Sequence, residues 1–577
     1  TIASSEIYKV DLDGKTQLWL QKGLYNSLNF SPDGTHVLIS IIDKPFSYLV
    51  PYQRFPSRDI VYTNTGKVVR EVNSTPLTEV LPKGFMATRT GKRNINWRAD
   101  KGASLYFVQA LDNGDPEVKV EFRDELFSWD APFNGEPVSL VKLKQRFSSV
   151  NWGNKDLAVV SDYWWNTRNA KTYVFNPSNP SVAPRLLYDL NYDDKYADPG
   201  EIQMKKNEFG AYVMDLQGTE VFLFGEGFTP DGQFPFIDRL NLSTGLTKRV
   251  YRSSYINKLE SLQSFINVKT GEILVRIESA TEYPNYFIRN INQKGKALPR
   301  KITDFKNPFI ALEKVHKEVI KYQRTDGVEL SGTLYLPAGY DKSKKEKLPM
   351  IMWAYPREYK DKSSAGQTTS NPNQFTFPSY GSPIYWVTRG YAVLDNAAFP
   401  IVGEGDTQPN DTFIEQLVAN AKAAIDAVDE LGFIDRKRVA VGGHSYGAFM
   451  TANLLTHCDL FACGVARSGA YNRTLTPFGF QSEERSFWEA MDVYNTMSPF
   501  ITADKMNSPL LLVHGEADNN PGTFTLQSER YFNALKGMGK PARLVILPKE
   551  SHGYVAKENI LHLLWEQDRW FEMYLKK

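Results

Sequence analysis

Cysteine is nearly absent from this sequence, which has only Cys458 and Cys463 among its 577 residues. Two thiols five residues apart cannot form a disulfide framework or a four-ligand zinc site, so we expect two buried free thiols. Clustered His, Cys and carboxylate ligands for a metal are also lacking. Gly403-Glu404-Gly405 has neither the third glycine nor the strand-to-helix frame of a nucleotide-binding loop. We therefore expect no metal and no cofactor.

Long hydrophobic runs and a charge of one sign are lacking too. No stretch approaches the ~20 consecutive apolar residues of a membrane-spanning helix, so we expect no membrane span. Lys plus Arg (68) nearly balances Asp plus Glu (66), which argues against a nucleic acid as partner. The chain begins at Thr1 without an initiator Met or a signal-like segment, so we expect a leader or a longer N-terminal region to precede this numbering.

Two halves of the sequence follow different patterns. A chain of 577 residues exceeds the ~250 to 300 residues of a single core, and we predict two domains, residues 1–314 and 315–577. The first contains short alternating strands between turn dipeptides such as Asp13-Gly14 and Asp231-Gly232. It is therefore predicted to be all-β, and at ~40 to 50 residues per blade it is long enough for about six or seven propeller blades. Without a clean repeat, the pattern leaves a β-propeller and a pair of β-sandwiches open.

The second half alternates apolar strands with helices, a pattern typical of a mostly parallel, doubly wound sheet covered on both faces. The clearest helix is predicted at 412–431, with Thr412 and Glu415 spaced as a capping box and Gly432 just beyond its C-terminus. The predicted strands are 348–353, 392–395, 438–442, 464–466, 510–513 and 542–547.

A strand at 438–442 leads directly into Gly443-His444-Ser445-Tyr446-Gly447 and then into an apolar, helix-like segment. This is the context of a nucleophile elbow, in which a serine sits on a strained turn and the flanking glycines let the two backbones approach. The hydroxyl is then exposed at the start of a helix, whose dipole favours developing negative charge. We predict that Ser445 is the nucleophile of a serine hydrolase with an α/β-hydrolase domain.

The partners of such a serine follow it in the order acid, then histidine. Asp518 comes just after the predicted strand 510–513, and His552 just after the strand 542–547. His552 is expected to accept the serine proton, while Asp518 holds the imidazole in the right tautomer. Glu516, two residues from Asp518, competes for the acid role, and we favour Asp518.

An oxyanion needs two donors, and the backbone N–H of Tyr446 is the first, because it directly follows the serine. The second is expected from the loop after the strand 348–353. That loop begins Ala354-Tyr355-Pro356-Arg357 and lacks the H-G-G-G motif of lipases. The hydroxyl of Tyr355 is the natural candidate.

These residues resemble the prolyl oligopeptidase family of serine peptidases, which joins a β-propeller to an α/β-hydrolase domain and has a tyrosine oxyanion donor at the position of Tyr355. Within the family, the runs at 442–455, 466–481 and 514–522, together with N-I-N-W-R-A-D at 94–100, are similar to the glutamyl endopeptidase branch of plant chloroplasts and bacteria. Relatives of that branch have more chain before the propeller, so we allow for an incomplete propeller here.

The resemblance implies cleavage after glutamate. Arg473 follows Arg467-Ser468-Gly469-Ala470-Tyr471-Asn472, in the segment where the family builds its main specificity pocket. An arginine fork can bind a carboxylate through two charge-assisted hydrogen bonds. Arg467 and Arg485 are the rivals of Arg473 for this role, and Tyr471 is expected to supply an apolar wall.

Three other functions remain open. An exopeptidase of the same family would need paired acids for a free amino group, for which Asp124-Glu125 is the nearest candidate. A carboxylesterase is disfavoured by the large β half, and a non-catalytic propeller binding protein by the complete set of Ser445, Asp518 and His552. Peptides are the expected partners and a homo-oligomer is left open. The resemblance favours an exported or organellar compartment over the cytoplasm.

Overall fold

The computed structural model describes residues 3–293 and 298–576 of the chain. The chain forms two compact units. Unit 1 comprises residues 1–192, 199–224 and 237–250, and unit 2 comprises residues 193–198, 225–236 and 251–577. The boundary predicted between residues 314 and 315 falls inside unit 2, just before strand β27 (His316–Gln323), the first strand of the C-terminal sheet.

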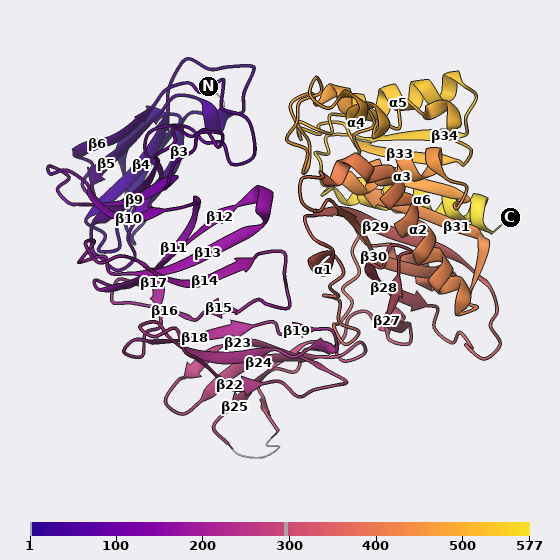
Figure 1. Cartoon of the computed structure of the whole chain (residues 1–577), viewed down its shortest axis with the longest axis horizontal. Coiled ribbons are helices and arrows are strands. Elements are labelled where there is room, and N and C mark those ends of the chain that lie inside the picture. Colours follow the sequence, from indigo (N-terminus) through magenta and orange to yellow (C-terminus); the bar gives the residue numbers. More distant parts are fainter. Residues whose placement is uncertain (1–2, 294–297, 577) are drawn as a thin grey trace. The chain divides into compact units, whose positions relative to one another are not determined.

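Unit 1 is built of four-stranded antiparallel sheets that follow one another along the chain, from indigo to magenta in Figure 1. A two-stranded pair, β1 (Ser5–Val10) and β2 (Thr16–Gly23), comes first. The sheets are β3 (Tyr25–Phe30), β4 (His36–Ile42), β5 (Ser57–Thr63) and β6 (Val68–Thr75); β7 (Arg93–Trp97), β8 (Ser104–Ala110), β9 (Asp124–Asp130) and β10 (Val138–Leu143); β11 (Arg146–Asn154), β12 (Leu157–Trp164), β13 (Asn169–Phe175) and β14 (Arg185–Asn191); and β15 (Glu201–Ile202), β18 (Glu220–Gly225), β21 (Phe236–Asn241) and β22 (Thr247–Arg252).

Apolar clusters join each of these sheets to the next. Leu38 and Val61 of the first sheet pack with Trp97 and Phe107 of the second, and corresponding clusters join the second sheet to the third and the third to the fourth. Inner strands are buried on both faces: in β12, Ala158 and Val160 pack in one cluster and Val159 in the next. The sequence-based expectation of an all-β half is therefore confirmed for these sheets.

Unit 2 contains one more four-stranded antiparallel sheet and several small elements. Its strands are β23 (Leu259–Asn267), β24 (Glu272–Glu278), β25 (Asn285–Asn290) and β26 (Arg300–Lys301). The small elements are β19 (Phe228–Thr229), β20 (Gly232–Gln233) and helix α1 (Lys362–Ala365), and β16 (Met204–Lys206) pairs with β17 (Tyr212–Met214) in unit 1.

The rest of unit 2 is an eight-stranded sheet in the order β27-β28-β30-β29-β31-β32-β33-β34. The first two pairings, β27 with β28 and β28 with β30, are antiparallel, and the other five are parallel. The strands are β28 (Glu329–Leu336), β29 (Leu348–Tyr359), β30 (Ala392–Val402), β31 (Ile434–His444), β32 (Cys463–Arg467), β33 (Leu510–Gly515) and β34 (Ala542–Leu547). This is the mostly parallel α/β-hydrolase sheet predicted from the sequence.

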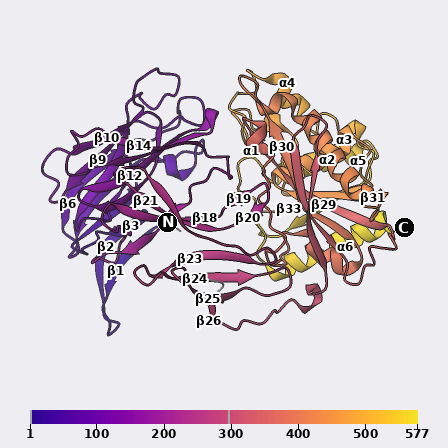
Figure 2. The ribbon, with the colours of Figure 1, turned by 60° about the horizontal axis from the view of Figure 1, so that its bottom comes forward.

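Helices cover both faces of this sheet. Helices α2 (Phe413–Glu430), α3 (Tyr446–His457) and α5 (Leu526–Gly537) lie on one side and α6 (Lys557–Leu575) on the other (Figure 2), while α4 (Met491–Thr496) follows β32. Each face has its own hydrophobic core. In β29, Met350 and Met352 pack in the core under α2, α3 and α5, and Ile351 packs in the core under α6. Successive side chains of a strand point to opposite faces, which explains why the central strands are continuously apolar.

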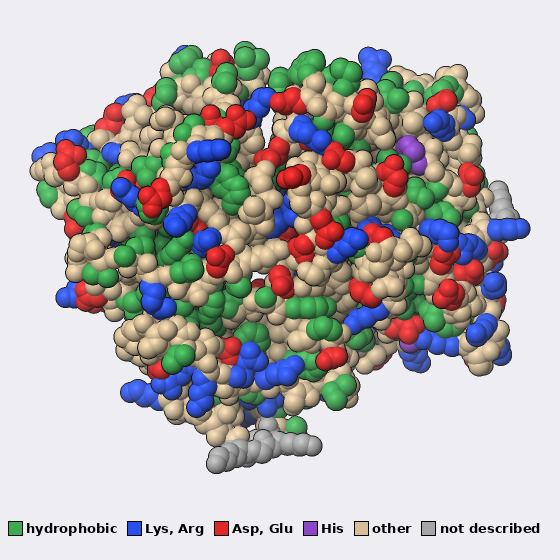
Figure 3. All heavy atoms as spheres, viewed as in Figure 1, with side chains coloured by type: hydrophobic (Ala, Val, Ile, Leu, Met, Phe, Trp, Pro, Cys, Tyr) green, Lys and Arg blue, Asp and Glu red, His purple; other side chains and the backbone are tan. Residues whose placement is uncertain are grey.

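The capping box predicted for α2 is wrong. Thr412 makes no side-chain cap, because a 3₁₀ turn (Pro409–Thr412) precedes the helix and carries its own box between Gln408 and Asp411. Gly432 has a φ of 83°, as expected of the residue beyond a helix C-terminus. No described helix is long and apolar enough to cross a membrane. On the face drawn in Figure 3, acidic and basic side chains are interspersed.

Candidate active site

The elbow lies where β31 ends and α3 begins. Ser445 has φ 58° and ψ −116°, a conformation that is unfavourable for a residue with a Cβ and that persists only where the surroundings enforce it. A Cβ on Gly443 would come within 2.4 Å of the Gly447 backbone. The amide of Ser445 donates to the carbonyl oxygen of Arg467 over 2.8 Å. The turn is therefore tight and is fixed to the neighbouring strand β32.

The same turn is pressed against the end of β29. A Cβ on Gly447 would come within 2.6 Å of the carbonyl oxygen of Ala354, so helix α3 starts directly beside Tyr355. The Tyr355 ring lies 5.9 Å, centroid to centroid, from that of Tyr446, the residue after the serine. Removal from water raises the pKa of Tyr355 and outweighs the opposing influence of the nearby Ser445 side chain. The structure thus brings Tyr355 and the predicted nucleophile together.

Replacing Gly447 by alanine tests this close approach. The added methyl group must push α3 away from Ala354, and we expect a loss of about 1 to 3 kcal/mol in stability together with a large loss of hydrolytic activity. Gly537→Ala, at the end of α5, is the matched control because its Cβ would meet nothing within 4 Å. Urea unfolding and ester hydrolysis measure the two effects. Equal stability and equal ester hydrolysis in the two variants would contradict the proposed role of the contact between Gly447 and Ala354.

Asp518 and His552 meet at the carboxyl ends of the last two strands. A Cβ on Gly515 would come within 2.2 Å of the carbonyl oxygen of Ser551, so the two loops pass in direct contact. His552 Nδ1 lies 2.9 Å from Asp518 Oδ2. Because the carboxylate is an acceptor, Nδ1 carries the proton and Nε2 is left as the acceptor.

The environment of Asp518 keeps it ionised. Burial alone would raise its pKa, but the hydrogen bonds from His514, His552 and the amide of Asn520 outweigh burial and hold the pKa below the usual range. Glu516, the rival acid, is exposed and accepts from the amide of Lys549 over 2.9 Å. The structure brings Asp518, and not Glu516, to His552.

His444 links this pair to the elbow. Its ring centroid lies 4.8 Å from that of His552, and it directly precedes Ser445 in the chain. Burial, followed by the nearby charge of Arg467, lowers the pKa of His444 to about 3. The ring beside His552 is therefore neutral at ordinary pH.

A pocket of about 390 Å³ opens at Ser445. One wall is the segment after β32, which runs past Arg473 through 475–481, and the other is the loop 520–523 after Asp518. The first wall is internally anchored: the amide of Gly479 donates to the Tyr494 hydroxyl over 2.9 Å and the amide of Phe487 to the carbonyl oxygen of Pro477 over 2.7 Å.

Arg473 is the cation of this pocket. Its side chain is only 3% exposed, and the guanidinium carbon lies 4.0 Å from the ring centroid of Phe449 and 4.4 Å from that of Phe480. Burial lowers its pKa to about 10, so it stays charged at neutral pH. Its Nε is buried and has no hydrogen-bond partner among the described residues. Arg467 also has a buried Nε without a partner, but among the arginines only Arg473 lines this pocket.

The rival arginines are engaged elsewhere. Arg467 donates to the carbonyl oxygens of Tyr380 and Gly381 over 2.7 and 2.8 Å. Arg485 pairs with Glu483 and Asp411, each over 2.8 Å. Neither lines the pocket.

Tyr471 is also absent from the pocket lining. It is fully buried, and its ring stacks on that of Tyr531 with a centroid distance of 4.8 Å. Asp124, the acid considered for an exopeptidase, is buried and pairs with Arg93 and with Arg146, the latter over 3.2 Å. It is thus neutralised inside unit 1.

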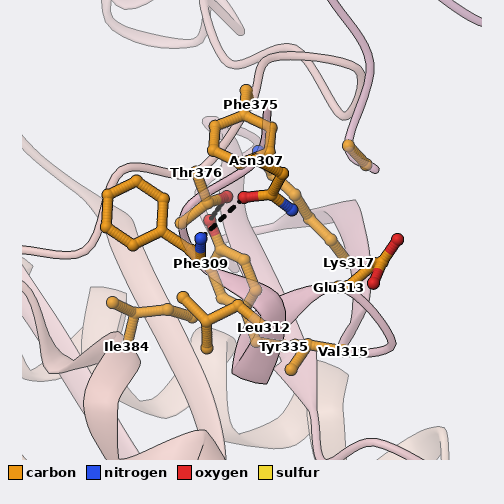
Figure 4. A pocket seen from close by; sticks show the side chains of 11 residues that line it. Asn307, Phe309, Leu312, Glu313, Val315, Lys317, Tyr335, Phe375, Thr376 and Ile384 are labelled. Atoms are coloured by element: carbon orange, nitrogen blue, oxygen red, sulfur yellow. Dashed lines mark hydrogen bonds between the residues drawn. The ribbon is translucent and has the colours of Figure 1, made fainter. Parts of the chain in front are cut away.

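A second pocket, shown in Figure 4, contains none of the predicted site residues. It is apolar on one side, with Lys317 and Glu313 on the other, and it encloses about 20 Å³, room for about one water molecule. The described residues contain no group of three or more His, Cys, Asp or Glu side chains that could hold a metal.

Three site residues were missed by the reasoning from sequence. His514 and Thr523 contact Asp518, and Glu358 accepts from the Tyr446 hydroxyl over 2.6 Å. Burial raises the pKa of Glu358. A signal for His514 existed, since it directly follows the predicted strand 510–513 and lies four residues before Asp518. Nothing in the sequence marked Glu358.

An eight-stranded, mostly parallel sheet with a serine elbow and an Asp–His pair on its carboxyl-end loops defines the α/β-hydrolase class. Residues 410–577 match the model of the prolyl oligopeptidase family, and residues 326–474 match that of the X-Pro dipeptidyl-peptidase (S15) family. The C-terminal part of the chain is a domain of the prolyl oligopeptidase family.

Two curated plant proteins are similar over nearly the whole chain. Both are described as "probable glutamyl endopeptidase, chloroplastic", from Oryza sativa subsp. japonica and from Arabidopsis thaliana, and each is 45% identical over 99% of this chain. The chain spans 62% and 61% of their lengths. A dipeptidyl-peptidase 5 of Porphyromonas endodontalis is 26% identical over 44% of the chain.

Solved structures support the same fold. An acylaminoacyl peptidase of Pyrococcus horikoshii has a TM-score of 0.62 at 17% identity, and the match covers 99% of this chain and 85% of the peptidase chain. A puromycin-hydrolysing peptidase of Mycobacterium tuberculosis has a TM-score of 0.63 at 15% identity, with coverages of 99% and 83%. At these identities the likeness concerns the fold alone.

Proposed function

We propose that this protein is a serine endopeptidase that cleaves after glutamate in peptides or unfolded chains. One observation carries the proposal: the buried guanidinium of Arg473, with an unpaired Nε, lines the same pocket as Ser445. An apolar substrate side chain would leave this donor unsatisfied, and a lysine would meet a like charge. A glutamate carboxylate would supply the acceptor that this unpaired donor lacks.

The chemistry would follow the serine peptidase scheme. Ser445 Oγ attacks the carbonyl carbon of the scissile bond while His552 Nε2 takes the hydroxyl proton, and His552 then passes that proton to the leaving amine. Asp518 stabilises the imidazolium through the 2.9 Å bond to Nδ1. Water then hydrolyses the acyl-enzyme by the reverse sequence of proton transfers.

The oxyanion would form between two donors at the elbow. The backbone N–H of Tyr446, at the N-terminus of α3, is the first. The hydroxyl of Tyr355, whose pKa is influenced by the nearby Ser445 side chain, is the second. A raised pKa keeps this phenol protonated at neutral pH, as a donor must be.

We further propose that residues 1–314 form the blades of a β-propeller, complete or incomplete, and that residues 315–577 form the catalytic domain. Successive four-stranded antiparallel sheets joined by apolar clusters support this. The plant relatives favour an organellar or exported compartment.

A library of N-terminally blocked peptides, varied at the residue before the scissile bond, tests the proposal. We expect cleavage after glutamate, with products identified by mass spectrometry, and little cleavage after glutamine. Free N-termini should make no difference, because an endopeptidase does not need them. Cleavage that requires a free N-terminus would indicate an exopeptidase, and hydrolysis of esters alone would indicate a carboxylesterase.

A further inference from the structure

A second histidine contacts the carboxylate that pairs with His552. His514, the fifth residue of β33, is completely buried. Its Nε2 lies 3.0 Å from Asp518 Oδ2 and 2.7 Å from the carbonyl oxygen of Thr523. Both oxygens are acceptors, so Nε2 carries the proton and donates to both. Nδ1, 2.6 Å from Ser528 Oγ, then accepts from that hydroxyl.

The Oδ2 atom of Asp518 is where three donors converge. His552 Nδ1, His514 Nε2 and Thr523 Oγ1 lie 2.9, 3.0 and 3.3 Å from it, and Oδ1 accepts from the amide of Asn520 over 3.0 Å. The donors other than His514 belong to loops, whereas His514 is part of β33, which is paired on both sides in the sheet. It is therefore the contact that fixes the carboxylate to the sheet.

We propose that His514 is a positioning residue, which holds Asp518 in the orientation that His552 needs and shares the charge of Oδ2 with it. The inference rests on the proposed function of Ser445, His552 and Asp518. The same ring also holds Thr523, which lines the pocket. One buried side chain thus links the Asp518 carboxylate to a wall of the substrate pocket.

Few other charged or titratable groups face this cluster. They are His444 at the end of β31, Arg467 at the end of β32 and Tyr554 after His552. His444 is neutral, and Arg467 is engaged with two carbonyl oxygens. The charge on Oδ2 is therefore divided mainly between His552 and His514.

Replacing His514 by phenylalanine removes its donor and keeps the ring. Loss of the aspartate itself costs about 10⁴ in kcat in a related triad, so we expect the loss of one of its donors to cost less, about tenfold to a hundredfold in kcat, with KM little changed. Oδ2 then keeps only His552 and the longer contact from the Thr523 hydroxyl, so more of its charge acts on His552. The midpoint of the acidic limb of kcat/KM should therefore move upward.

His514→Gln serves as the conservative variant, because its amide nitrogen can reach the position of Nε2 and donate to Oδ2. We expect it to recover most of the activity and the parental acidic limb. His562→Gln, on the exposed face of α6, is the matched control. Rates are measured with 4-nitrophenyl acetate and with a blocked glutamate peptide, and folding is checked by urea unfolding. If His514→Phe does not fold, His514→Asn, with an amide too short to reach Oδ2, takes its place.

Two results would overturn the inference. One is a His514→Phe variant whose kcat and acidic limb of kcat/KM are unchanged. The other is an equal loss of kcat in His514→Phe and His514→Gln, which would indicate that His514 contributes only to packing. Ser445-dependent hydrolysis of the ester by the parent is measured first. Its absence would remove the proposed triad and this inference together, whereas an active parent with an unaffected His514→Phe variant would remove the inference alone.

Discussion

Replacing Ser445 by alanine is expected to lower kcat for a blocked glutamate peptide by roughly 10⁵ to 10⁶, the loss seen when a serine nucleophile is removed from a triad. The reason is that Ser445 supplies the hydroxyl on the strained turn between β31 and α3, beside Tyr355. KM should change little, because the pocket around Arg473 is untouched.

The matched control is Ser343→Ala, an exposed turn residue whose hydroxyl bonds to Asp341. It should retain the parental rate. A fluorophosphonate probe should label the parent and the control, but not Ser445→Ala. Labelling of the alanine variant, or a rate within tenfold of the parent, would contradict the assignment of the nucleophile.

The second large effect is expected from Arg473→Met. Methionine can fill the space beside Phe449 and Phe480 without offering a donor or a charge. Truncating one partner of a buried charge pair costs about 2 to 5 kcal/mol, so kcat/KM for a glutamate peptide should fall by about 30-fold to several thousandfold. Cleavage after methionine or glutamine should fall far less, and ester hydrolysis should remain.

Three further arginine variants complete this experiment. Arg473→Lys should recover only a small part of the glutamate activity, because an ammonium cannot form the paired bonds of a guanidinium. Arg467→Met and Arg485→Met change the two rival arginines, which do not line the pocket. An unchanged preference for glutamate in Arg473→Met, or its loss in Arg485→Met alone, would refute the assignment of Arg473.

Much of the architecture could be predicted because the signals are local. The elbow combines a strand, two glycines with no room for a Cβ and an apolar helix, all within about 20 residues. The strands of the C-terminal sheet are continuous apolar runs because both faces are covered, and β34 has the predicted bounds. Strands β29 and β30 extend well beyond their predicted ends. Polar residues interrupt the apolar pattern, Arg357 and Glu358 in β29 and Asp395 and Asn396 in β30.

Other features depend on tertiary contacts that no sequence pattern encodes. Tyr471 was expected to form a pocket wall, but its ring stacks on that of Tyr531, which lies 60 residues further along the chain in helix α5. Thr412 does not cap α2, because a 3₁₀ turn with its own box between Gln408 and Asp411 precedes the helix. In the sequence His514 is only a residue before a glycine, and the fold alone brings Asp518 and Thr523 to the same ring nitrogen.

The pocket wall 473–481 has a consequence for protein engineering. It is anchored by hydrogen bonds to Tyr494 and Phe487, while the residues proposed for bond cleavage are supplied by the turn after β31 and by the loops after β33 and β34. The wall that carries Arg473 and the proposed triad therefore come from separate stretches of the chain, and only the other wall, 520–523, shares a loop with Asp518. Exchanging the wall 473–481 should retarget the protein to other side chains while leaving its hydrolytic machinery in place.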